Sequence, residues 1–298
     1  MSNRDVEQFV YNLRNKLSNT PDNLKLKTIK DALNTIQDPS QKSLAESLLD
    51  IVTNVVGLPS NIVVLIHGIR TYAQWQELLK SELESKDTKA FTIGYGYFDA
   101  FRFWFPFVFR RFPINKVKQQ LRNIQTNHPK DKIIVVAHSY GTYVISKIIS
   151  DEPDIKVHRL LLCGSIIKNS FRWDKLARLP QGGIINDCGT KDIWPVLAKS
   201  LSWGYGSSGR FGFQTSEVEN RYHNLGHSDF FEIEFMRQFW LPFLLNGECI
   251  KSDWNKQIPN PPILIKFFDI LPTSNLILFG TPIIMYRNEL VMILKNLF

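Results

Sequence analysis

The sequence predicts an α/β fold in which a mostly parallel central sheet is flanked by helices and preceded by a helical extension. From residue 60 onward, short apolar runs alternate with segments of helical periodicity. The apolar runs are continuous, which is typical of parallel strands covered on both faces. One of them ends in a turn of small residues, Ala137-His138-Ser139-Tyr140-Gly141, that leads straight into a helical stretch.

Residues 1–58 form the predicted helical extension. Apolar residues recur at helical spacing in three successive stretches. Their positions are Val6, Phe9, Val10, Leu13 and Leu17, then Ile29, Leu33 and Ile36, then Leu44, Leu48, Val52 and Val55. We expect this extension to pack against the main domain; the alternative is a surface for a partner protein.

The main domain is predicted over residues 59–298. Its strands are expected at 62–66, 90–95, 132–137, 159–163, 183–187 and 218–223, and its helices at 74–83, 114–124, 142–149 and 194–201. In such a sheet, ligands bind beyond the carboxyl ends of the strands. From about residue 246 the pattern assigns no element to the sheet, because Pro259-Asn260-Pro261-Pro262 breaks any helix and the later apolar runs are interrupted.

Composition indicates an ordinary globular protein, with 44% hydrophobic and 21% charged residues. The three cysteines, Cys163, Cys188 and Cys249, have no CxxC spacing, which argues against a disulfide framework or zinc site and favours the reducing cytoplasm. No export signal or membrane-spanning run of roughly 20 apolar residues is predicted. The net charge of +8 favours peripheral contact with an anionic membrane; without a nucleic-acid-binding motif, we expect no nucleic acid partner.

The turn around Ser139 is the most informative feature for function. A serine on a sharp turn from a buried strand into a helix has the geometry of a nucleophile elbow. The turn is so tight that the positions two before and two after the serine must be small, and here they are Ala137 and Gly141. Glycine is usual at the first of these, so Ala137 is a one-residue departure. The helix places Ser139 at the positive end of its dipole.

A serine becomes a nucleophile when a base takes its proton, and that base is normally a histidine held by a carboxylate. On this kind of sheet the chain order is serine, acid, histidine. Asp192, in a loop just past the predicted strand 183–187, and His227, in a loop past the last predicted strand, supply this order. Asp187 and His223 are the competing choices, but each is expected to belong to its strand.

Residues 60–245 resemble the α/β-hydrolase superfamily, most closely its lipase- and esterase-like members. The resemblance is carried by four pieces: His67-Gly68 after a strand, the elbow around Ser139, the loop Gly189-Thr190-Lys191-Asp192, and Gly226-His227-Ser228. It implies acyl transfer to water through a serine ester. Ser139 would attack, His227 would act as the base and Asp192 would hold the imidazole; this chemistry implies no cofactor and no metal.

A developing oxyanion needs preorganised donors, for which backbone amides serve well. The amide of Tyr140, directly after the nucleophile, is the first expected donor. The second is the amide of Ile69 in the loop after the first strand, with Arg70 as the alternative, and Gly68 lets this backbone approach the substrate. His67 and His138 are expected to shape the site by hydrogen bonds.

Residues 98–112 concentrate aromatic side chains with three arginines. Three explanations stay open: buried core, an apolar wall for an acyl chain, or an interfacial surface in a lipid headgroup zone. By contrast, Gly204-Tyr205-Gly206-Ser207-Ser208-Gly209 matches G-x-G-x-x-G but follows a helical stretch and leads towards a strand. A dinucleotide fingerprint has the opposite order, so a flexible loop is predicted there.

The sequence therefore predicts a lipase-like serine carboxylesterase acting on a small-molecule or lipid acyl compound. Amidase or peptidase chemistry on the same fold is one alternative. A catalytically silent hydrolase fold used for binding is the other.

Overall fold

The computed structural model describes residues 8–9, 11–13, 16–17, 28–29, 31–43, 46–47, 60–68, 74–86, 88–94, 110–201, 204–256 and 259. The chain divides into two compact units, Met1–Ser60 and Asn61–Phe298. In the first unit, Leu13, Leu17 and Ile29 pack together as a small buried cluster. These are three of the apolar positions found at helical spacing.

The second unit is built on a six-stranded sheet in the order β2-β1-β3-β4-β5-β6, and every neighbouring pair is parallel. The strands are β1 (Asn61–Ile66), β2 (Lys89–Ile93), β3 (Lys132–His138), β4 (Arg159–Cys163), β5 (Ile184–Gly189) and β6 (Glu219–His223). The predicted α/β class is confirmed.

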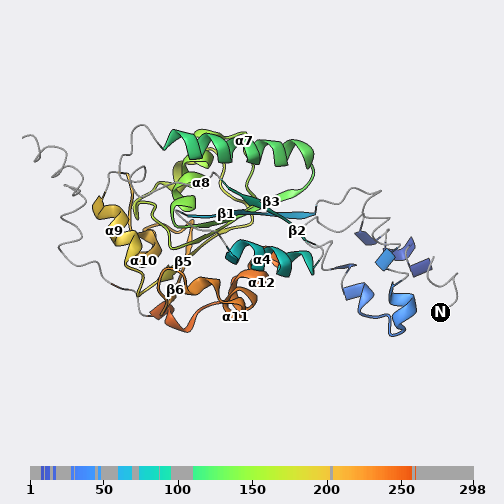
Figure 1. Ribbon diagram of the computed structural model, residues 1–298. Helices are drawn as coiled ribbons and strands as arrows, with labels where there is room; N and C mark the ends of the chain where they lie inside the picture. The colour runs from blue at the N-terminus through green and yellow to red at the C-terminus, as the bar shows by residue number, and fades with distance from the viewer. Residues whose placement is uncertain are drawn as a thin grey trace, which may run out of the picture. The chain divides into compact units, whose positions relative to one another are not determined.

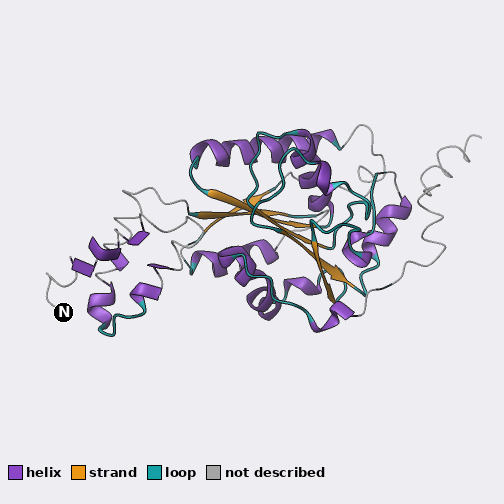
Figure 2. Ribbon diagram, turned by 180° about the vertical axis from the view of Figure 1, so that it is seen from behind, coloured by secondary structure: helices purple, strands orange, loops and turns teal. Residues whose placement is uncertain are grey.

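Helices cover both faces of this sheet (Figure 1), and the same layers are seen from behind in Figure 2. One face carries α7 (Arg111–Asn127) and α8 (Tyr140–Asp151). The other carries α4 (Gln74–Glu84), α11 (Ile233–Phe235) and α12 (Leu241–Asn246), the last two joined by a π-helical turn, Met236–Trp240. Two further helices, α9 (Trp194–Leu201) and α10 (Ser208–Phe211), lie beyond one end of the sheet. Within the described ranges, no helix is both long and apolar enough to cross a membrane.

Strand β1 shows why the sequences of these strands are continuous apolar runs. Alternate side chains of a strand point to opposite faces of the sheet. Ile62, Val64 and Ile66 pack into the core formed with α7 and α8, whereas Val63 and Leu65 pack into the core formed with α4 and α12. Both faces are covered by apolar side chains, so each of the five buried positions from Ile62 to Ile66 is apolar, and only Asn61, at the half-buried start of the strand, is polar.

Two expectations need correction. Strand β5 continues two residues beyond its predicted end, because its pairing with β6 extends through Gly189↔His223. The segment 204–209 is not a flexible loop: Ser208 begins α10, and the backbone of the loop after β4 leaves no room for a Cβ atom at Gly206 or Gly209.

The aromatic segment 98–112 is described only from Arg110, and residues 260–298 lie outside the described residues.

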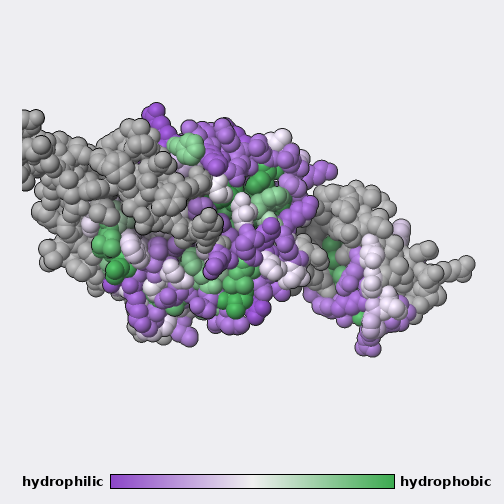
Figure 3. Space-filling view, in the orientation of Figure 1, coloured by the Kyte–Doolittle hydropathy of each residue, from purple (hydrophilic) through white to green (hydrophobic). Residues whose placement is uncertain are grey.

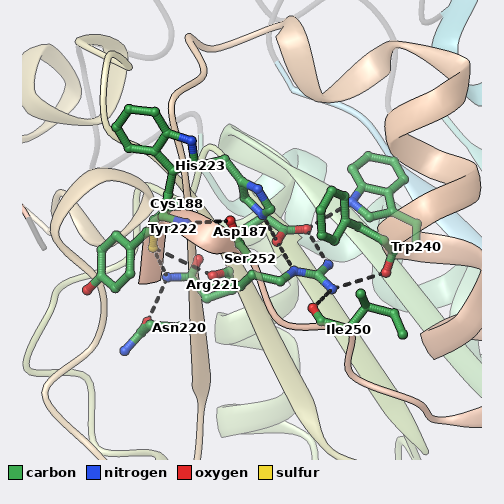
Figure 4. A network of polar contacts seen from close by, with 12 residues as sticks. Asp187, Cys188, Asn220, Arg221, Tyr222, His223, Trp240, Ile250 and Ser252 are labelled. Carbon is green, nitrogen blue, oxygen red and sulfur yellow. Dashed lines mark hydrogen bonds and ion pairs between the residues drawn. The ribbon is translucent and has the colours of Figure 1, made fainter. Parts of the chain in front are cut away.

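A buried ion pair ties β5 and β6 to the helices that follow them (Figure 4). Asp187 accepts hydrogen bonds from Arg221 Nε at 2.6 Å and Nη2 at 2.9 Å, from His223 Nε2 at 2.9 Å and from Trp240 Nε1 at 2.9 Å. Arg221 also donates to the carbonyl oxygens of Phe239 and Ile250, each at 3.1 Å. Burial raises the pKa of Asp187, but Arg221 and His223 outweigh it and hold the pKa well below its usual range.

Replacing Asp187 by asparagine tests this network. The change leaves the Arg221 guanidinium buried without its counter-charge, so we expect the free energy of unfolding to fall by about 3–5 kcal/mol. Urea unfolding followed by circular dichroism measures this. Asp174→Asn is the control, because it breaks an exposed Arg172–Asp174 pair of 2.6 Å and is expected to leave the free energy of unfolding unchanged. Equal free energies of unfolding for Asp187→Asn and the wild type would contradict the account.

The same network gives stability a defined dependence on pH. Because the pKa of Asp187 is lower in the folded state, its stabilisation is present above the unfolded-state value of about 4 and is lost as pH falls towards the folded value. We expect the stability difference between wild type and Asp187→Asn to shrink as pH falls below about 4. Urea unfolding at a series of pH values checks it, and a difference that grows at low pH would contradict it.

Candidate active site

Ser139 lies on the turn from β3 into α8 in a conformation that side chains rarely adopt. Its φ is 52° and its ψ is −120°, and among the described residues it alone has a positive φ without being glycine. Its N–H donates to Cys163 O on β4 at 3.0 Å, and its carbonyl oxygen accepts from Thr142 Oγ1 at 2.6 Å. These bonds hold a strained turn, as is typical of functional sites.

Gly141 shows why the elbow requires a small residue. A Cβ atom there would lie 2.7 Å from His67 O and 2.8 Å from Ile66 O. Both atoms belong to the backbone at the end of β1, so neither can move aside without disturbing the sheet. The predicted requirement for a small side chain two residues after the serine is therefore confirmed.

Asp192 and His227 are brought together although 35 residues separate them. Asp192, buried in the loop after β5, accepts a hydrogen bond from His227 Nδ1 on its Oδ2 at 2.8 Å, and its Oδ1 accepts the N–H of Trp194 at 3.0 Å. The two loops are also joined through their backbones, since the N–H of Thr190 donates to His223 O at 2.9 Å and that of Lys191 to Leu225 O at 3.1 Å. With Nδ1 donating, Nε2 of His227 is the atom that could accept a proton.

His227 lies beside the elbow. Its ring packs on the ring of His138 with centroids 4.5 Å apart, and a Cβ atom added to Gly164 would be 2.9 Å from its Cε1 and Nδ1. Gly164 follows Cys163, whose carbonyl oxygen holds the N–H of Ser139. In the described part of the chain no hydrogen bond joins Ser139 Oγ to His227; such bonds often tighten only when substrate binds.

No protein-family model and no curated protein sequence matches the chain. Among solved structures it is similar to an uncharacterized protein from Bacillus cereus ATCC 10987, with 11% identity over 82% of this chain and 88% of that chain and a TM-score of 0.45. It is also similar to a cold-adapted esterase from an Arctic intertidal metagenomic library, with 15% identity over 60% and 82% and a TM-score of 0.42. An alpha-beta serine hydrolase homologue from Coxiella burnetii shares 15% identity over 60% and 81%, with a TM-score of 0.39.

The chain has the α/β-hydrolase fold. Its own topology carries this statement: parallel strands with helices on both faces, a strained serine between β3 and α8, an acid after β5 and a histidine after β6. The chain order Ser139, Asp192, His227 is the order that this fold uses.

The two other histidines of the site make the hydrogen bonds expected of them. His138 Nε2 donates to the backbone carbonyl of His227 at 3.2 Å, and His67 Nδ1 donates to Gly68 O at 2.6 Å. Burial, with a smaller contribution from His227, holds the pKa of His138 well below its ordinary value, so the ring stays neutral. His138 therefore fixes the backbone of His227 without adding a charge beside it.

The expected oxyanion donors are only partly described. Tyr140 is the first residue of α8, so its amide lies at the helix N-terminus directly after Ser139. Ile69 and its alternative Arg70 lie outside the described residues. Gly68, just before them, does approach Ser139 closely, because a Cβ atom on it would be 2.8 Å from Ser139 Cβ and 3.3 Å from Oγ.

The competing pair, Asp187 and His223, is engaged elsewhere. Both side chains are buried and hydrogen bonded to each other within the Arg221 network (Figure 4). The structure thus forms two Asp–His pairs, and it is the pair Asp192–His227 that lies against the elbow. In the described ranges, no three His, Cys, Asp or Glu side chains are grouped as a metal site would require.

Sequence reasoning missed two residues that border the site. Gly164 has a φ of 54° and lies against the His227 ring, and Trp194 has its ring centroid 6.2 Å from that of His227. For Gly164, the available signal in the sequence was its position directly after the apolar strand that neighbours the elbow strand. For Trp194 the signal was an aromatic residue two positions after the acid.

Gly164→Ala tests the position of His227. The new methyl group would push the imidazole away from Asp192, and misplacement of a catalytic group by about 1 Å costs on the order of 10²-fold in rate. We expect such a loss in the hydrolysis of p-nitrophenyl acetate, with the protein still folded by circular dichroism.

Gly183→Ala is the matched control. It also places alanine at a positive φ, of 102°, but its Cβ would meet nothing closer than Phe243 at 3.7 Å, at the far end of β5 from the site. We expect it to lower stability and to keep its activity per folded molecule. Equal rates for Gly164→Ala and Gly183→Ala would contradict the placement of His227.

Proposed function

We propose that this protein is a serine hydrolase that cleaves a carboxylic ester of an apolar acyl compound through Ser139, His227 and Asp192. The observation that carries the proposal is the 2.8 Å hydrogen bond between His227 Nδ1 and Asp192 Oδ2 beside a serine held at a φ of 52°. A catalytically silent fold is disfavoured, because all three side-chain types are present in the order that the fold uses.

The reaction follows from these positions. Ser139 Oγ attacks the ester carbonyl carbon while Nε2 of His227 takes its proton, and Asp192 holds the imidazole in the right tautomer and stabilises the imidazolium. His227 returns the proton to the departing alcohol, which leaves an acyl ester on Ser139. Water, deprotonated by His227, then releases the acid. The oxyanion of each tetrahedral intermediate is stabilised by the amides of Tyr140 and Ile69.

The environments of the two aspartates suit different roles. Asp187 is saturated by Arg221, His223 and Trp240, so it has no capacity to respond to a change of charge on a histidine at the site. Asp192 has one oxygen on the Trp194 amide and the other on His227, whose side chain is 16% exposed. A partly accessible histidine held by a buried carboxylate is what a general base requires.

Substitution of the three residues tests the proposal. With p-nitrophenyl butyrate as substrate, we expect Ser139→Ala and His227→Gln to lower kcat by at least about 10³-fold and Asp192→Asn by a comparable or smaller factor. Ser146→Ala is the control: it removes a buried hydroxyl of the same helix, bonded to Tyr143 O, that lies outside the site. Hydrolysis by Ser139→Ala at the wild-type rate would overturn the proposal.

A further inference from the structure

An exposed apolar face begins in the loop that carries Asp192. Of the large apolar side chains that are exposed in the described residues, three lie in one run: Ile193, Trp194 and Leu197, with 55%, 57% and 41% of their surface accessible. Figure 3 shows green, apolar atoms at the surface in the region of α9, at the left of the view. The other exposed ones, Tyr11, Leu78 and Phe112, are far apart in the sequence.

The three side chains lie at the start of α9: Ile193 directly precedes the helix and its carbonyl oxygen accepts the N–H of Leu197 at 3.0 Å, whereas Trp194 and Leu197 belong to the first turns of the helix. Ile193 and Leu197 are four residues apart and Trp194 and Leu197 three, which are the spacings of neighbours on a helix. Pro195 and Ala198, between and after them, are buried. The helix therefore already has an apolar side for the core, and this second apolar side leaves much of its surface in solvent. Clustered exposed apolar residues mark binding surfaces more often than single ones do.

This face is tied to the candidate catalytic pair. The N–H of Trp194 donates to Asp192 Oδ1 at 3.0 Å, so the start of α9 is anchored on the same carboxylate that holds His227. The Trp194 ring lies 6.2 Å from the His227 ring, centroid to centroid, at an angle of 46°. The indole is therefore a neighbour of the imidazole, and Leu197 lies one helical turn further along α9.

We propose that this face, formed by Ile193, Trp194 and Leu197, receives the apolar chain of the ester, with Trp194 as the specificity-determining residue. The inference rests on the proposed function and deepens it by naming the surface that selects the substrate. The face is formed by three apolar side chains that leave 41% to 57% of their surface accessible for contact with an aliphatic chain. Each methylene group that becomes buried on it would raise kcat/KM by up to about fourfold, so long chains would be favoured over acetate.

The test is the ratio of kcat/KM for p-nitrophenyl octanoate to that for p-nitrophenyl acetate, both kept below the concentration at which they form micelles. We expect Trp194→Ala to lower this ratio by at least about tenfold, Trp194→Phe to restore most of it, and Leu197→Ala to lower it by a smaller factor. Leu78→Ala on α4 is the matched control: Leu78 and Leu197 are both 41% exposed, but Leu78 lies outside the face. It is expected to leave the ratio unchanged.

Acetate hydrolysis that depends on Ser139 separates the two claims. If it is present and Trp194→Ala leaves the ratio unchanged, or lowers both substrates equally, the inference falls and the proposed function stands. If Trp194→Ala impairs only hydrolysis of esters presented in phosphatidylglycerol vesicles, the face binds a lipid surface and the inference is overturned. If the wild type hydrolyses neither ester, the proposed function and the inference fall together.

Discussion

The parallel pairing of the six strands is the constraint on which the site depends. Because all the strands run the same way, their carboxyl ends meet at one edge, and the loops that follow β1, β3, β4, β5 and β6 converge there. Ser139, Gly164, Asp192 and His227 come from four of these loops. The strand register fixes how these residues lie relative to one another. Because His138 pairs with Cys163, the residues that follow them, Ser139 and Gly164, leave the sheet side by side. Because Gly189 pairs with His223, the loops that carry Asp192 and His227 also start side by side.

Close packing and a buried ion pair hold these loops in fixed positions relative to one another. At the elbow, Gly141 lies against the backbone of Ile66 and His67, which allows α8 to start directly after Ser139 with Tyr140 as its first residue. Beneath the other two loops, the bonds of Arg221 to Asp187 and to the carbonyl oxygens of Phe239 and Ile250 join β5 and β6 to the helical layer. The framework that positions Ser139, Asp192 and His227 is therefore buried, and the catalytic roles proposed for them require positions that are fixed before substrate arrives.

Much of this arrangement could be predicted from the sequence, because its strongest signals are local. The elbow is predicted from five consecutive residues, and buried strands are predicted from continuous apolar runs. Asp192 is preferred over Asp187 because the strand is predicted to end at residue 187. In the structure β5 pairs with β6 as far as Gly189, two residues further. A local sequence pattern does not predict which distant residues a side chain contacts in the fold. The bond from His138 to the His227 carbonyl, the contact of Gly164 with the imidazole and the place of Trp194 depend on residues 30 to 90 positions away. The domain boundary at residue 59 and the role of Ile69 stay predictions.

Covalent labelling tests the central claim most directly, because it reports the nucleophile without assuming a substrate. The full chain is treated with a fluorophosphonate, and its intact mass and its peptides are measured by mass spectrometry. The account predicts one adduct per chain, on Ser139, that forms much more slowly in His227→Gln and is absent from Ser139→Ala. A folded wild-type protein that stays unlabelled, or that carries its adduct on another residue, would contradict it.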